Sequence, residues 1–148
     1  MAVAGGCVAM ALITGSLSVL TYQRNQVWQT SETLWRDSIK KDPGNFMAHN
    51  NLGNYLLLKG KTDEAVNHFQ RALKNAPYAD MALDNLGIAY AMKGEYEKAE
   101  KSFERLLHLK PGDKEIFQKI GELMIKTGQL EKAEQYFQQV VAVDPKNY

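Results

Sequence analysis

The chain of 148 residues has few of the residues that build disulfides or metal sites. Its one cysteine, Cys7, excludes an intrachain disulfide and a zinc site made from several cysteines. The histidines His49, His68 and His108 fit no metal-binding spacing, so we expect them to be structural. Phosphate-binding glycine loops and nucleophile elbows are also missing. We therefore expect no enzyme activity, no catalytic residue, no cofactor and no metal in this sequence.

An excess of charge of one sign is missing as well. The 18 Lys and Arg residues nearly balance the 17 Asp and Glu residues, and the formal net charge is +1. Because this balance gives no bulk attraction to a polyanion, we expect no nucleic-acid partner. Acidic and basic residues alternate in one segment: Glu95, Glu97, Lys98, Glu100, Lys101, Glu104 and Arg105. We interpret this segment as a solvated helix face with pairing between residues four apart.

Charged residues are absent from residues 2–23, AVAGGCVAMALITGSLSVLTYQ. A run of about 20 uncharged residues is long enough to cross a bilayer as a helix. We predict a transmembrane helix over residues 1–23, with a removed signal peptide or a buried soluble helix as the alternatives. The basic residues that follow an isolated anchor would keep the rest of the chain in the cytoplasm.

One segment recurs along the chain. NLGNYLLLKGKTDEA at 51–65 returns as NLGIAYAMKGEYEKA at 85–99, and more faintly as KIGELMIKTGQLEKA at 119–133. The period is 34 residues, and a fixed period of this length indicates a repeat protein. The units share these columns: Leu52-Gly53, Leu86-Gly87 and Ile120-Gly121; Gly60, Gly94 and Gly128; Ala65, Ala99 and Ala133; Phe69, Phe103 and Phe137; Pro77, Pro111 and Pro145.

This pattern, L-G-x2-[LYM] followed by A-x3-F-x2-[ALV] and P, resembles the tetratricopeptide repeat (TPR), a helix–turn–helix unit. The resemblance implies an all-α solenoid with full repeats at 46–79, 80–113 and 114–148. Residues 24–45 carry only the second half of the pattern, so we interpret them as a junction and a degenerate half-repeat. We expect Trp35 of this half-repeat to pack under the first full repeat.

Glycine recurs in two columns of the repeat, and each column predicts a local geometry. Gly53, Gly87 and Gly121 would lie inside helices, where glycine costs about 1 kcal/mol relative to alanine, so we expect a close neighbour there. The column of Gly60 falls where the first helix ends and a left-handed residue is favoured. The predicted helices cover residues 46–59, 62–76, 80–93, 96–109, 114–127 and 130–143.

The segment TYQRNQVWQTSETLWRDSIKKDPGNFMAHNNLG, residues 21–53, resembles a junction in a group of membrane enzymes. These are polytopic glycosyltransferases with TPR tails, including the transmembrane-and-TPR O-mannosyltransferases. The shared features are an Arg-Asn, a Trp, a Leu-Trp and a P-G-N that leads into the repeats. The resemblance implies a membrane localisation with the repeats in the lumen or periplasm. The catalytic loops of such enzymes have no counterpart in this sequence.

The concave face of such a solenoid has no packing role, so we expect it to bind a peptide or a partner helix. The predicted groove residues are Asn50, Asn51, Asn54, Asp84, Asn85, Ile88, Gln118, Lys119 and Glu122. Asn51 and Asn85 share a column, and their amides could bracket an extended peptide as an asparagine ladder does in the O-GlcNAc transferase array. The alternative is a local packing or capping role. A carboxylate clamp fits worse, because Asn50 and Glu115 stand where the clamp uses lysines.

Taken together, these features predict a membrane-tethered protein–protein interaction module. The alternative is the accessory C-terminal TPR tail of a polytopic membrane glycosyltransferase, which would position acceptor or partner proteins. The last unit has apolar residues, Phe137, Val140 and Val141, without an obvious cover. This predicts that a homo-oligomer contact or further repeats cover that end.

Overall fold

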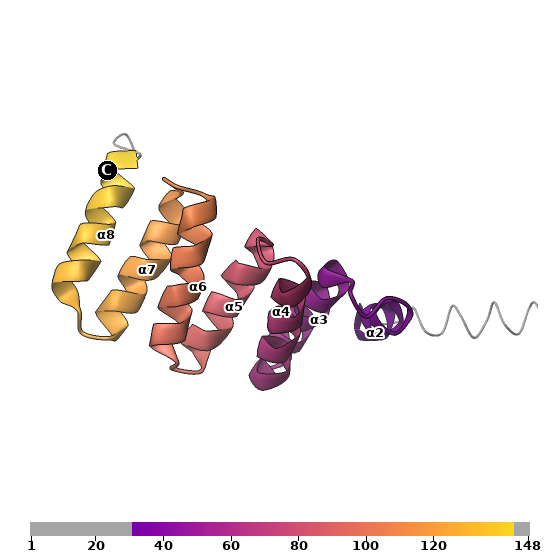
Figure 1. Cartoon of the computed structure of the whole chain (residues 1–148). Coiled ribbons are helices and arrows are strands. Elements are labelled where there is room, and N and C mark those ends of the chain that lie inside the picture. The colour runs from indigo at the N-terminus through magenta and orange to yellow at the C-terminus, as the bar shows by residue number, and fades with distance from the viewer. Residues whose placement is uncertain (1–30, 144–148) are drawn as a thin grey trace, which may run out of the picture.

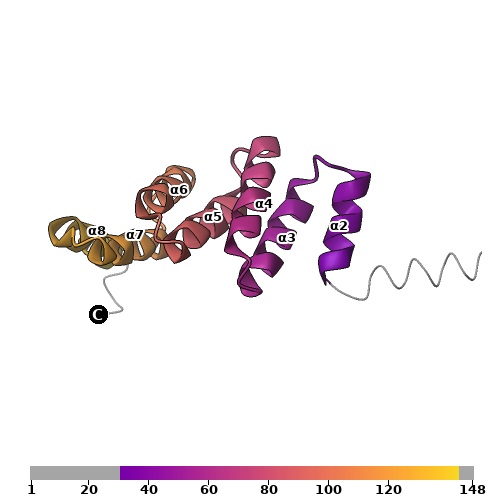
Figure 2. The same ribbon diagram turned by 90° about the horizontal axis from the view of Figure 1, so that it is seen from below.

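The computed structural model describes residues 31–143, and within this range the chain is all helix and turn, with no strand. The helices follow one another in a single stack from α2 to α8 (Figure 1). Figure 2 shows the same order from below, with α2 at one end beside α3. The helices are α2 (Ser31–Lys41), α3 (Phe46–Leu58), α4 (Thr62–Asn75), α5 (Asp80–Met92), α6 (Tyr96–Leu109), α7 (Lys114–Lys126) and α8 (Leu130–Val143).

The helices predicted from the repeat are confirmed to within one residue at each end. The first helix of each repeat ends one residue early because Lys59, Lys93 and Thr127 are its C-caps. The glycine after each cap has a φ between 74° and 75°, a left-handed conformation that residues with a Cβ rarely adopt. The predicted helix stop is therefore confirmed at Gly60 and its two equivalents.

The glycines inside the first helices admit aromatic rings from the second helices. A Cβ added to Gly53 would lie 2.6 Å from Cε1 of Phe69, and one added to Gly87 would lie 2.5 Å from Cε1 of Phe103. Both distances are shorter than carbon atoms tolerate. The close neighbour predicted from the sequence is thus a phenylalanine of the same repeat.

One apolar core runs through the stack. It contains Leu52, Phe69, Leu83, Ile120 and Met124, all with almost no exposed surface. Each such side chain contributes about 1.5–3 kcal/mol on burial. Trp35 and Ile39 of α2 pack against this core, which confirms the packing predicted for Trp35 and makes the half-repeat part of the stack.

Two imidazoles connect α3 to α4 of the first repeat, and one of them also contacts the half-repeat. His49 of α3 lies with Nδ1 2.9 Å from Nδ1 of His68 on α4, and its Nε2 is 3.2 Å from the carbonyl oxygen of Pro43. Because a carbonyl only accepts, Nε2 of His49 carries the proton and Nδ1 of His49 accepts from His68. Both histidines thus have the structural role expected of them.

The predicted membrane helix at residues 1–23 lies outside the described residues. Among residues 31–143, no helix has the length and apolar character needed to cross a membrane.

Candidate peptide-binding groove

All nine predicted groove residues lie on the first helices of the repeats, α3, α5 and α7. We call the side of these helices that carries them the groove face. Five of them have side chains with exposed or half-exposed surface and contribute to pockets on this face: Asn51, Asp84, Ile88, Lys119 and Glu122. Asn54 and Gln118 are exposed and Asn85 is half-exposed, but these three line none of the described pockets, and Asn50 is buried.

Polar side chains on the groove face join successive repeats. The Asn85 amide donates a hydrogen bond to Oδ1 of Asn50 over 3.1 Å, and the Lys119 ammonium donates to Asp84 over 2.5 Å. Each pair spans 35 residues, so each uses the same two columns of adjacent repeats. Four of the predicted groove residues therefore contact one another across the repeat junctions.

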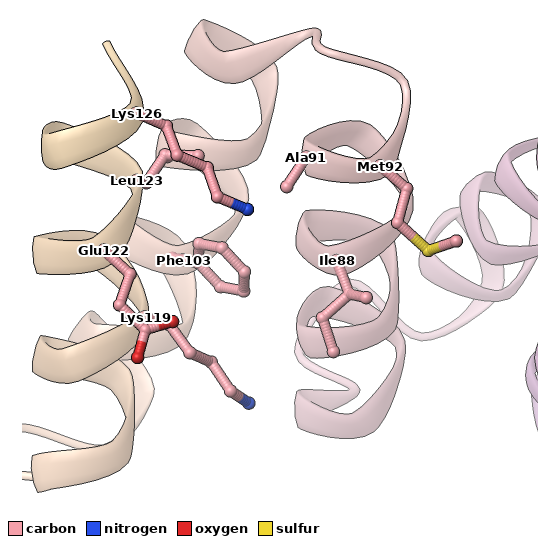
Figure 3. A pocket seen from close by; sticks show the side chains of 8 residues that line it. All are labelled: Ile88, Ala91, Met92, Phe103, Lys119, Glu122, Leu123 and Lys126. Atoms are coloured by element: carbon pink, nitrogen blue, oxygen red, sulfur yellow. The ribbon is translucent and has the colours of Figure 1, made fainter. Parts of the chain in front are cut away.

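A pocket of about 230 Å³ opens between α5 and α7. Figure 3 shows its walls, with Ile88 and Ala91 of α5 on one side and Lys119, Glu122 and Lys126 of α7 on the other. Phe103 of α6 lies at the back of the pocket. The complete lining is Ile88, Ala91, Met92, Phe103, Lys119, Glu122, Leu123 and Lys126. The floor is thus apolar and the α7 rim carries charges of both signs.

A second pocket of about 270 Å³ lies between the N-terminal ends of α3 and α5. Its wall is largely apolar, with Phe46 and Met47 from α3 and Met81 from α5, and Asn51 adds an amide. The second position of each repeat was expected on the concave face, although Met47 and Met81 were not among the nine predicted groove residues. The signal for Met47 and Met81 was their shared column, because both stand second in their repeat.

Electrostatics at the edge of the groove face fix one carboxylate in its charged form. The Lys110 ammonium lies 2.6 Å from Asp80, and this hydrogen bond holds the pKa of the Asp80 carboxyl below its usual range. The same contact raises the pKa of Lys110. Within the described residues, no group of three His, Cys, Asp or Glu side chains is arranged to hold a metal ion.

The comparison with protein families matches the helical stack. A family model described as Tetratricopeptide repeat matches residues 46–111, and a second model with the same description matches residues 90–148. Residues 46–148 belong to the tetratricopeptide-repeat family. The TPR array predicted from the sequence is thereby confirmed.

Among curated proteins, part of this TPR chain is similar to human Protein O-mannosyl-transferase TMTC1. The two are 34% identical over 77 residues, which is 48% of this chain and 9% of the relative. The chain thus spans less than a tenth of the relative's length. The resemblance to O-mannosyltransferases with TPR tails is confirmed for this part of the chain.

Two solved TPR structures share the fold. The crystal structure of MamA has a TM-score of 0.74 at 25% identity and covers 78% of this chain and 67% of its own. The first TPR of Spaghetti (RPAP3), bound to HSP90 peptide SRMEEVD, has a TM-score of 0.63 at 21% identity and covers 70% of this chain and 82% of its own. At this identity the second likeness shows the fold alone.

Proposed function

We propose that this chain is a membrane-tethered interaction module that binds a peptide or a partner helix on its groove face. The observation that carries the proposal is the set of exposed methionines on that face. Met47, Met81 and Met92 are 53%, 56% and 61% exposed, and each lines a pocket. Methionine adapts its shape to apolar ligands and is common at peptide-binding surfaces. Exposed apolar side chains that gather on one face are typical of a surface that a partner covers.

The two pockets indicate which kind of partner the groove face can bind. An extended peptide or a helix that lies along the groove face would place one apolar side chain in each pocket. Asn51 of α3 lines the second pocket, and Asn85 holds the same column on α5, so their amides would meet the backbone of a peptide that lies along both helices. Asn85 uses one of its two N–H groups on Asn50, so the other N–H and Oδ1 are free for the ladder role.

The groove face does not favour a peptide C-terminal carboxylate. A carboxylate clamp also uses an arginine, and Lys119 is the cation of this chain that could take its place. Lys119 is already paired with Asp84. Glu115 adds a negative charge at the edge of the same helix. We therefore propose internal peptide segments with apolar side chains as ligands, a different class from the chaperone peptide bound by the RPAP3 TPR.

Selection of a random peptide library against the full chain in neutral detergent, followed by affinity measurements on the enriched peptides, tests this function. Met81→Glu and Met92→Glu each place a charge in one pocket, and we expect each to weaken binding at least about tenfold. The matched control is Leu130→Glu, since Leu130 is equally exposed but lies on α8, away from the groove face. Peptides that bind all three variants equally would contradict the proposal.

The second candidate function is that of an accessory tail of a membrane glycosyltransferase, which positions acceptor or partner proteins while the chemistry happens elsewhere. The similarity to TMTC1 favours it, because the matched part is a small share of a longer enzyme. In this case residues 2–23 would be a membrane helix and the repeats would face the lumen or periplasm.

Protease protection in intact microsomes separates the two orientations. We expect the repeats to resist added protease until the membrane is opened with detergent. Digestion in intact microsomes would place the repeats in the cytoplasm, and release of the chain by alkaline carbonate would exclude a membrane span.

A further inference from the structure

The charges of α6 are sorted onto two sides of the helix. Lys98, Lys101 and Arg105 line a cleft between α6 and α4, whereas Glu100 and Glu104 line another between α6 and α8. This sorting follows from spacing, because residues three, four and seven apart share one face of a helix. It also corrects the pairing expected from the sequence. Within α6 no ion pair joins residues four apart, and the pair that forms in this segment joins Lys98 to Glu95.

The cleft between α4 and α6 is strongly basic. Lys74 of α4 joins the three α6 cations, and no carboxylate lines the cleft, although the chain as a whole is nearly neutral. Lys98 lies 2.7 Å from Glu95, and Arg105 uses one nitrogen to donate to the Pro77 carbonyl over 3.1 Å. Within residues 31–143, Lys74 and Lys101 form no ion pair. Their like charges therefore repel each other without compensation.

A neutral donor faces the same cleft from α5. Tyr90 lines the cleft but is only 8% exposed, and its hydroxyl oxygen accepts a hydrogen bond from the Gln70 amide over 2.8 Å. Because the oxygen is already held by a donor, the hydroxyl proton points elsewhere and finds no acceptor among the described residues. A buried hydroxyl with an unused proton beside cations is suited to an anion with oxygen acceptors.

We propose that this cleft, formed by Lys74, Tyr90, Lys98, Lys101 and Arg105, binds a phosphate group. A phosphate dianion accepts several charge-assisted hydrogen bonds at once, and Arg and Lys are its usual partners. The cleft has a volume of about 390 Å³, which leaves room for more than one phosphate group. The ligand is either a soluble phosphate compound or the phosphate headgroup of a lipid. The site is formed by α4, α6 and Tyr90 of α5, and it shares no residue with the two pockets of the groove face.

Calorimetric titration of the full chain in neutral detergent with inorganic tripolyphosphate tests the site. The variant Lys74→Gln/Lys101→Gln removes two cleft charges, and Lys40→Gln/Lys132→Gln removes two exposed lysines elsewhere as a control of equal net charge. We expect the cleft variant to bind at least about tenfold more weakly and the control to stay within about twofold. No binding, or equal weakening in both variants, would overturn the proposal.

Tyr90→Phe and lipid micelles complete the test. Tyr90→Phe keeps the ring and removes the hydroxyl, so we expect it to weaken tripolyphosphate binding several-fold.

Mixed micelles with phosphatidic acid separate the two sources of phosphate. Tighter association of the chain than of the cleft variant with these micelles indicates a lipid headgroup, and equal association indicates a soluble ligand. Unchanged tripolyphosphate affinity in Tyr90→Phe would remove the hydroxyl from the site.

Discussion

Single residues decide how closely the two helices of each repeat approach. Gly87 leaves room for the ring of Phe103, whereas Gly94, two residues after α5, has open space around it and lets the chain turn toward α6. Both are glycine columns of the repeat, yet the first is required by a ring and the second by a positive φ of 75°. The two kinds of glycine therefore predict different costs on substitution.

Gly87→Ala should destabilise the fold by about 2–4 kcal/mol, because the new methyl group meets Phe103 and overpacks a full core. Gly94→Ala has open space around it and should cost only about 1–2 kcal/mol through its left-handed backbone. Urea unfolding followed by circular dichroism compares the two. A Gly87→Ala protein as stable as the parent would show that the phenylalanine ring moves aside at little cost.

The amide pair on the groove face makes a second prediction at this scale. Asn85→Ala leaves the buried Oδ1 of Asn50 without its donor and should cost about 1–2 kcal/mol of stability. Asn51→Ala should leave stability nearly unchanged but weaken a selected peptide. Asn67→Ala, at an exposed position of α4 away from the groove face, is the control for both. Equal peptide affinity in all three variants would contradict the role of Asn51 and Asn85 as an asparagine ladder.

At the scale of elements, a pair of histidines joins α3 to α4 of the first repeat at its junction with the half-repeat, where His49 also contacts the Pro43 carbonyl. Burial, followed by the neighbouring His49, lowers the pKa of His68 to about 4, and Arg36 of α2 and Arg71 of α4 act in the same direction. Glu64 of α4 opposes them. His68 already donates its Nδ1 proton to His49, so a second proton on His68 would go to Nε2 and place a positive charge beside His49, Arg36 and Arg71.

Acidification should therefore loosen this junction. The folded chain holds the pKa of His68 near 4, whereas the unfolded chain leaves it near 6.5, so the unfolded chain binds the proton first. The stabilisation is complete above about pH 6.5 and is lost as the pH falls toward 4. The loss should be on the order of 2 kcal/mol. Urea unfolding at several pH values measures it.

His68→Gln should flatten this pH dependence, and His108→Gln, which changes an exposed histidine of α6, should keep it. A stability profile between pH 4 and 6.5 that is the same in both variants would rule out His68 as its source.

At the scale of the whole molecule, the period of 34 residues was enough to predict the stack. The columns that form the core, end the helices and face the groove keep the same role in each repeat, so these features could be predicted from the sequence. Asn50 and Asn85 could not be paired in advance, because their contact joins two different columns of successive repeats. The basic cleft could not be predicted from the sequence, because Lys74 and Lys101 lie on helices that are not consecutive. The net charge of the whole chain is close to zero and gives no sign of a local cluster of cations.

The apolar side of α8 makes a prediction about assembly. Leu130 and Val141 are eleven positions apart, so they lie on one side of the helix, and both are exposed. We expect the chain to self-associate through this side and expect Val141→Lys to reduce the association. Sedimentation velocity at several concentrations measures both. Equal sedimentation of the parent chain and the variant would show that this side of α8 does not mediate self-association.

The two junctions between full repeats use the same pair of columns but different chemistry. An amide pair joins the first repeat to the second, and an ion pair joins the second to the third. Exchanging the first two repeats would set the carboxylate of Asp84 against the amide of Asn51 and leave Lys119 opposite Asn50. Any arrangement in which the third unit does not follow the second loses the ion pair between Asp84 and Lys119. Deleting the second unit, for example, would leave the Lys119 ammonium opposite the neutral amide of Asn50.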